Sequence, residues 1–531
     1  MEGGHRCCID IDCGVDPALA GWRTEGRMRQ MARDLTRRRF LKASSALGVG
    51  VAGAATLAAC GETKVVEKIV TQVVEEEVIK EVTKEVQVVV EKVVTQAMAA
   101  PQPKTVEFEF VSDHVSGVRG KSTTWALANF QAERPDIKIK FTPQGGGFDD
   151  SFGIRIAAGS APATALLSWG FFGSHQDSFV QINDLLDRHP DFDGADLIYE
   201  PDSYTINYDT TWPFVDSFQG HAFGLPYQGN VSGHYYNIDL YDQYGVPEPS
   251  ADWTYSNEWL DAAKQATDPD NEIYGTRIGG GGDIHYWTPI SWGFGAKQFI
   301  SSDGTHTEHF DNGGDRGFQF AVDLIHRHGV SPATDAQREL AGEFGDAFSA
   351  GKIGAELRRG DAKGNAVISI GDRFRWALAP QPKGDVTGTV AVHRTNQGHY
   401  VIDSARRQGV VEPVVDFLVG MAGPKMQARA ATDRGFLPCR WDALESPENL
   451  AAPPERQDLL VSFVRGEFRT WQGYHPNQRE WLAWRGRAHL AMTGEASVEE
   501  AIESAVNEGD RILRQDVDLL NKRIERWGRT A

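Results

Sequence analysis

Residues 105–141 read TVEFEFVSDHVSGVRGKSTTWALANFQAERPDIKIKF, and this stretch decides the fold class. Apolar and polar side chains alternate over residues 106–111, which is typical of a half-buried strand. We expect an amphipathic helix near residues 122–134 and a second strand over residues 137–141. Because a helix separates the two strands, the order predicts a right-handed parallel crossover unit and hence an α/β fold.

A third strand extends the predicted sheet. A helix over residues 152–158 is expected to lead into an apolar strand at residues 165–169, which ends in aromatic residues. In parallel sheets of this kind, ligands bind beyond the carboxyl ends of the strands. That edge would carry polar and aromatic side chains from two strand ends: Asp113, His114, Trp169, Phe171 and Phe172.

Length and composition exclude several classes of protein. The chain has 531 residues, long enough for two or three domains with cores of their own. It carries 54 Lys and Arg against 74 Asp and Glu, a formal net charge of −20, which argues against a nucleic-acid partner. Its 5 cysteines are too few for a disulfide framework, and we expect Cys439 to be a buried, inert thiol.

The N-terminal segment has the pattern of an export signal. A basic start at residues 36–42 precedes an apolar run and a small-residue site that ends at Cys60. The pair Arg37 and Arg38 resembles a twin-arginine signal, and Leu-Ala-Ala-Cys resembles a lipobox. We therefore predict that residues 1–59 are removed and that a lipid on Cys60 anchors the protein at the outer face of the cytoplasmic membrane. Residues 1–27 have no such pattern, and we interpret them as an over-extended reading frame.

Residues 60–104 are predicted to form a stalk behind this anchor. Their central part is almost wholly Val, Ile, Glu, Lys, Thr and Gln, and apolar residues from Ile79 to Val93 step by 3 and 4, which indicates a coiled-coil seam. A flexible or strand-like tether is the alternative, because β-branched residues lower helix propensity. The stalk would be a spacer in both cases, and a coiled coil would allow it to self-associate.

The body carries a series of short motifs in a fixed order. They read GHAFGLPY (220–227), YYNIDL (235–240), DWT (252–254), FSAGKI (348–353), WALAPQP (376–382) and GFLP (435–438). This series resembles the extracellular solute-binding proteins of family 1, the maltose- and oligosaccharide-binding components of ABC importers, over roughly residues 105–510.

The resemblance implies a two-lobe periplasmic-binding-protein-like α/β fold with a ligand cleft that closes by hinge bending. Crossings between the lobes are expected near residues 229–231, 351–354 and 404–410. Lobe 1 would then contain residues 105–228 and 354–404, and lobe 2 residues 229–353 and 405–531. The body would be a monomer without cofactor or metal, and its partners would be a carbohydrate and the permease subunits of an ABC transporter.

The resemblance also implies ligand-binding residues in the first lobe. Sugars present apolar faces and a rim of hydroxyl groups, so they suit aromatic rings and planar polar side chains. Trp169 would be such a ring, with Phe171 and Phe172 in the following loop, although core packing is the alternative for each. Asp149 and Asp150 would be an acidic pair facing the cleft, or else an exposed helix start.

Further candidates lie at the hinge and in the second lobe. Gln228 and Asn230 would bind ligand hydroxyl groups from the first crossing. A loop after four glycines would contribute Asp283, His285 and Trp287, unless it is a surface turn with one buried ring. Arg358 stands near the place where many relatives have a tryptophan, and it could bind an anionic sugar.

The sequence patterns that would indicate a metal site or a catalytic site are incomplete or missing. The histidine pairs at 306 and 309 and at 326 and 328 lack further metal ligands and are expected at the surface. No nucleophile elbow, P-loop or dinucleotide fingerprint is present in the sequence. We therefore predict a substrate-binding lipoprotein of a sugar importer and no enzyme. The alternatives are a secreted, lipid-anchored carbohydrate-active enzyme, which would need two carboxylates at a set separation, and a surface adhesion or sensory protein.

Overall fold

The computed structural model describes residues 105–144, 148–168, 173–198, 205–206, 221–279, 284–301, 303–360, 363–466, 468–469 and 475–527. The predicted export signal, Cys60 and the stalk lie outside these residues. Among the described helices, none has both the length and the apolar character needed to cross a membrane.

A parallel crossover unit starts the body, as the sequence predicted. Strand β1 (Val106–Ser112) pairs in parallel with β2 (Ile137–Pro143), and helix α3 (Gly117–Glu133) connects them. Strand β3 (Thr164–Ser168), which follows α4 (Phe148–Ala157), pairs in parallel with the other edge of β1. The alternation of apolar and polar residues in β1 arises from a strand with one buried face, because the Phe108 and Phe110 side chains are buried.

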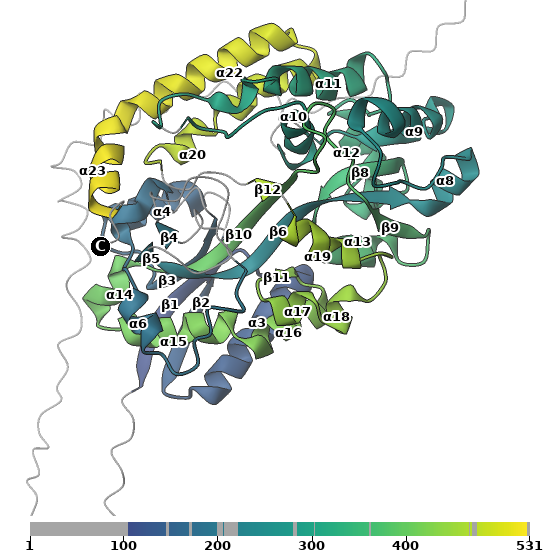
Figure 1. Ribbon diagram of the computed structural model, residues 1–531. Helices are drawn as coiled ribbons and strands as arrows, with labels where there is room; N and C mark the ends of the chain where they lie inside the picture. Colours follow the sequence, from purple (N-terminus) through teal and green to yellow (C-terminus); the bar gives the residue numbers. More distant parts are fainter. Residues whose placement is uncertain are drawn as a thin grey trace, which may run out of the picture. The chain divides into compact units, whose positions relative to one another are not determined.

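Two long strands continue this sheet through the body (Figure 1). They are β6 (Gly224–Asn237) and β10 (Val392–Val401), and the sheet order is β2-β1-β3-β10-β6-β8-β7. Strand β10 pairs antiparallel with both β3 and β6. Strands β8 (Ile353–Arg359), β9 (Trp376–Ala379) and β7 (Tyr274–Arg277) complete the far part of the sheet, where β8 and β9 both pair with β6.

Two main hydrophobic cores define the two lobes. The first packs β1 and β3 against helices α15 (Val411–Ala422) and α16 (Pro424–Asp433). The second is rich in tryptophan and includes helices α10 (Thr288–Gly293), α11 (Gly314–His326), α20 (Gln478–Trp481), α21 (Trp484–Thr493) and α22 (Val498–Leu513). A third cluster, with Val231, Val392 and Leu437, lies where β6 and β10 pass between them.

The cores divide the chain differently from the expected lobe boundaries. Residues 354–404 were expected in lobe 1, yet Leu357 and Ala377 belong to the second core. Residues 405–531 were expected in lobe 2, yet Val414 and Phe417 belong to the first core. The reason is the path of β10: its end pairs with β3, so the helices that follow it pack on the first lobe, and the chain returns to the second core with Trp481.

Shorter elements complete the described part of the chain. They are α6 (Asn183–Asp187), β4 (Thr205–Ile206), β5 (His221–Ala222), α8 (Ile238–Tyr244), α9 (Leu260–Gln265), α12 (Ala336–Ala341), α13 (Lys363–Ile370), α14 (Asp403–Gln408), β11 (Leu437–Pro438), α17 (Trp441–Leu444), α18 (Pro447–Leu450), α19 (Asp458–Arg465), β12 (Phe468–Arg469) and α23 (Val517–Trp527).

One histidine prediction was wrong. His309 was expected at the surface, but it is fully buried in the second lobe, where its ring stacks on Phe299 at a centroid distance of 4.6 Å. The ring is flat and apolar enough to pack among aromatic side chains.

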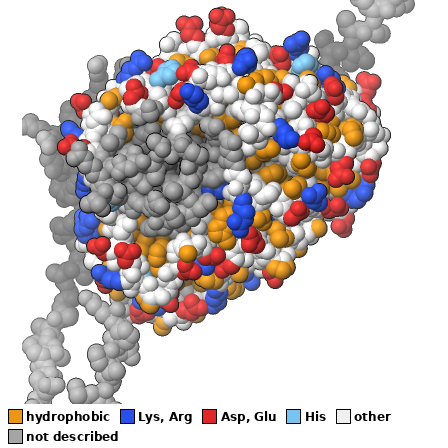
Figure 2. Space-filling model, in the orientation of Figure 1, with side chains coloured by type: hydrophobic (Ala, Val, Ile, Leu, Met, Phe, Trp, Pro, Cys, Tyr) orange, Lys and Arg blue, Asp and Glu red, His pale blue; other side chains and the backbone are white. Residues whose placement is uncertain are grey.

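On the face shown in Figure 2, acidic and basic side chains are interspersed over the described surface.

Candidate functional site

A band of polar side chains lies on one face of β6 and β10, where these strands pass from the first lobe to the second. Gln228 is paired with Gln397, and Asn230 with Thr395. Residues directly opposite each other in an antiparallel pair point to the same face, and alternate residues of a strand share a face. We call this set the polar band: Gln228, Asn230, Ser232, His393, Thr395 and Gln397.

The opposite face of the two strands has a structural role. Val231 belongs to the third hydrophobic cluster, and Tyr227 packs on Phe436 at 4.7 Å between ring centroids. The polar side chains on this face bind backbone carbonyls: Asn396 Nδ2 donates to Ile198 O at 3.2 Å, and Arg394 donates to Val464 O. The polar groups of the opposite face thus stabilise the fold.

Two acceptors of the polar band are buried and unpaired. Asn230 is 5% exposed, and its Oδ1 has no hydrogen-bond partner within the described part of the chain. The same holds for Gln397 Oε1 among the described residues. A buried acceptor without a donor costs free energy, on the order of 1–3 kcal/mol. A ligand that brings hydroxyl donors to this face would remove that cost.

The first lobe contributes charged groups to one end of the band. Arg119, in the first turn of α3, donates to Gln228 Oε1 at 3.4 Å and to Asp113 Oδ2 at 3.2 Å. Asp113 thus follows β1 as predicted and reaches the band through Arg119, which the sequence analysis missed. His114 is 1% exposed and packs against the rings of Tyr227 and Phe436, which belong to the first core.

The second lobe contributes His285 to the other end. Its ring meets that of His393 edge to face at 4.2 Å, and its carbonyl oxygen accepts a hydrogen bond from Ser232 Oγ at 3.4 Å. Burial, and then the nearby His285 and Arg359, lower the pKa of His393 well below its usual value. A neutral imidazole can both donate and accept, which suits a hydroxyl partner.

Trp287 lies away from the band. It is 1% exposed and packs in the second core against Phe318, at 4.9 Å, and against Trp484, at 6.1 Å. Of the predicted second-lobe loop, the structure therefore brings His285 to the band and leaves Trp287 in the core.

Arg358 also lies away from the band, whereas its neighbour Arg359 points to the face of the band. Arg358 is paired with Gly233, whereas Arg359 is paired with Ser232 and so points to the face of the band. The Arg358 guanidinium donates to both carboxylate oxygens of Asp346, at 3.1 and 2.8 Å, and to Glu356 at 3.1 Å. These carboxylates neutralise it, so the expected role in binding an anionic sugar does not fit Arg358.

The ion pair of Arg358 is a buried element of the second lobe. Although burial alone would raise it, the Arg358 guanidinium lowers the pKa of Asp346 to about 2. Arg277 Nε pairs with the other side of Glu356 at 2.6 Å. The two arginines and two carboxylates therefore compensate each other's charge.

Several predicted site residues belong to segments at the margins of the described ranges. Trp169, Phe171, Phe172 and Asp283 lie outside the described residues, and Asp149 and Asp150 stand in the first turn of α4 with side chains outside the description. The backbone of Ser168, just before this aromatic segment, is paired with Gln397 of the polar band.

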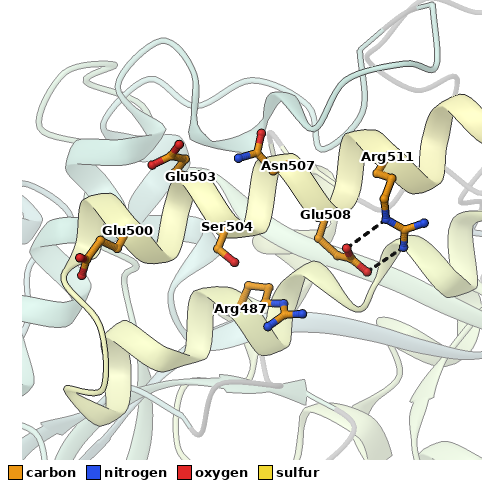
Figure 3. A pocket seen from close by; sticks show the side chains of 7 residues that line it. All are labelled: Arg487, Glu500, Glu503, Ser504, Asn507, Glu508 and Arg511. Carbon is orange, nitrogen blue, oxygen red and sulfur yellow. Dashed lines mark hydrogen bonds and ion pairs between the residues drawn. The ribbon is translucent and has the colours of Figure 1, made fainter.

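Two hollows on the described surface lie away from the predicted site residues. One of about 440 Å³ lies between α21 and α22, where Arg511 forms an ion pair with Glu508 (Figure 3). Another of about 710 Å³ lies between α11 and α22. Among the described residues, no group of three His, Cys, Asp or Glu side chains is placed to hold a metal ion.

The chain belongs to the bacterial extracellular solute-binding protein family. The sequence matches this family over residues 118–428, which is more than half of the chain. No curated protein matches the sequence significantly.

Solved structures of solute-binding proteins share the fold. One is an ABC substrate-binding protein from Listeria monocytogenes in complex with cycloalternan, with 18% identity, a TM-score of 0.62, and coverage of 79% of this chain and 99% of that chain. Another is the GacH receptor of Streptomyces glaucescens, also solved with acarbose, with 16% identity, a TM-score of 0.61, and 77% and 99% coverage. A third is the maltose/maltodextrin-binding domain of Bdellovibrio bacteriovorus bound to maltotriose, with 16% identity, a TM-score of 0.60, and 77% and 100% coverage. These similarities confirm the predicted two-lobe α/β fold.

Proposed function

We propose that this protein is the substrate-binding component of an ABC importer and that it captures a sugar or oligosaccharide at the polar band. The observation that carries the proposal is the pair of buried acceptors, Asn230 Oδ1 and Gln397 Oε1, which have no donor among the described residues. Hydroxyl groups of a carbohydrate are such donors. The family match and the oligosaccharides bound by the structural neighbours support the same class of ligand.

The geometry favours binding over hydrolysis. A glycosidase needs two carboxylates that flank the scissile bond. The carboxylate that reaches the polar band in the described part of the chain, Asp113, is paired with Arg119. We therefore propose capture without chemistry, followed by delivery to the permease subunits.

Export and anchoring are part of this proposal. The twin-arginine motif and the cysteine at position 60 would place the body outside the cytoplasmic membrane, where an importer meets its substrate. The stalk would hold the body at a distance from the lipid.

Calorimetric titration with maltotriose, cycloalternan and a uronic acid oligosaccharide tests the proposal. We expect saturable binding of at least one sugar and no cleavage products after prolonged incubation. Gln397→Ala should weaken binding, whereas the matched control Gln408→Ala, at an exposed end of α14, should not. Cleavage of the sugar, or equal affinity of both variants, would contradict the proposal.

A further inference from the structure

The C-terminal helix α23 is anchored in the second lobe by Leu520. This side chain is 1% exposed. It lies against Gly304, where an added Cβ atom would come within 2.3 Å of Leu520 Cδ2 and 3.3 Å of the His475 ring. Gly304 has a φ of +71°, so a side chain there would be strained by the backbone and would also collide with Leu520. The start of α23 is therefore fixed to the same lobe as α22.

One turn further along α23, Arg523 reaches the first lobe. Its side chain is buried, and Nη1 donates to the carbonyl oxygen of Gly173 at 2.6 Å. Its Nε and Nη2 donate to Asp177 Oδ2 at 3.1 and 2.8 Å. In Figure 1, α23 runs from the end of α22 toward α4 of the first lobe.

The segment that Arg523 binds is part of the first lobe. Next to Gly173 in the chain, the His175 ring packs edge to face on Phe152 at 5.5 Å, and Phe179 belongs to the first core. Burial, and then the cations Arg479 and Arg523, lower the pKa of His175 to about 4. Two cations of the C-terminal elements therefore converge on residues 173–178.

We infer that Arg523 is a positioning residue that couples ligand binding to closure of the two lobes. It holds Gly173 and Asp177 of the first lobe from a helix that is anchored in the second lobe. A contact that spans the lobes stabilises the conformation in which it is formed, so it shifts the population of molecules toward that lobe arrangement. The apparent affinity for a ligand that needs both lobes rises with that population.

This inference rests on the proposed function only where the dissociation rate of a bound sugar is measured. The first measurement is hydrogen exchange of the full chain without ligand. Arg523→Gln should speed exchange at residues 173–180 and leave the core strands β1 and β6 protected. Lys522→Gln is the matched control, because it removes the same charge from an exposed neighbouring position of α23.

The second measurement is the dissociation rate of a sugar that binds the wild type. Arg523→Gln should raise this rate roughly tenfold, which corresponds to about 1.4 kcal/mol, while Lys522→Gln leaves it unchanged. Asp177→Asn keeps a hydrogen-bond acceptor and lies at a half-exposed position, so it tests the contact with little risk to folding. The effects of Arg523→Gln and Asp177→Asn should be less than additive when combined.

The outcomes separate the two hypotheses. If no sugar binds the wild type but exchange at residues 173–180 rises in Arg523→Gln, the proposed function fails and the contact between lobes stands. If a sugar binds and its dissociation rate is the same in Arg523→Gln, the coupling role is overturned. Faster exchange throughout both cores would also overturn it, because Arg523 would then stabilise the whole fold.

Discussion

Asn230→Ala should weaken ligand binding without destabilising the ligand-free protein, and this combination distinguishes a binding residue from a core residue. In the described chain Asn230 Oδ1 is a buried acceptor without a donor, a state that costs about 1–3 kcal/mol. Removal of the amide abolishes this cost and loses some packing, so the melting temperature should stay constant or rise. The hydrogen bond to a ligand hydroxyl is lost, so affinity should fall roughly ten- to hundredfold.

Asn237→Ala is the matched control on the same strand. Asn237 is also buried, at 2% exposure, but its Oδ1 accepts from Leu240 N at 3.0 Å and caps helix α8. Loss of such a cap costs about 1 kcal/mol of stability. Calorimetric unfolding and titration of both variants should therefore give opposite patterns. If Asn230→Ala lowers stability as Asn237→Ala does and binds the sugar normally, the assignment of the polar band is refuted.

Three further predictions concern charge and attachment. Arg358→Met should lower the free energy of unfolding by about 3 kcal/mol or more, because it leaves buried carboxylates short of a partner. Arg359→Gln should instead mainly reduce ligand affinity. An equal loss of stability of the two variants in urea unfolding would contradict this prediction. His306 lies between two carboxylates, Asp510 at 2.9 Å and Asp311 at 3.1 Å, which raise its pKa against the effect of burial. A raised folded-state pKa stabilises below the unfolded value and loses this effect as the pH rises, so His306→Gln should cost more stability near pH 5.5 than near pH 8.5 in unfolding curves. Cys60→Ala should release the protein from the membrane fraction, and unchanged sedimentation with membranes would rule out the lipid anchor.

Local periodicity predicted the crossover unit because β1, α3 and β2 are each specified by neighbouring residues. Gln228 and Asn230 were predicted through the family resemblance, and the structure places both in the polar band. The partners on β10 were missed, because Thr395 and Gln397 join the band only through pairing with a distant strand. Their signal was present in β10 itself, whose residues HRTNQ form an unbroken polar run within a buried strand.

The position of Arg358 away from the band also depends on strand pairing. Two adjacent arginines in a strand point to opposite faces, and the pairing with β6 decides which of them faces the band. The lobe boundaries also depended on distant contacts, since an amphipathic helix such as α15 does not specify which core it will cover. Sequence patterns therefore predicted the elements, and pairing across the hinge determined the site.

The polar band and Arg523 can be separated experimentally because they lie differently with respect to the hinge. Asn230 and Thr395 are paired directly where β6 and β10 pass between the lobes, so we expect this pairing to persist when the angle between the lobes changes. Arg119 and His285 stand at opposite ends of the band, and a hinge motion changes the distance between them. A ligand that touches both ends therefore favours one angle. Substitutions within the band should change the affinity for a ligand without changing the angle between the lobes. Arg523→Gln should instead change the fraction of molecules that have the binding-competent lobe angle. It should therefore change the affinity for every ligand by one common factor.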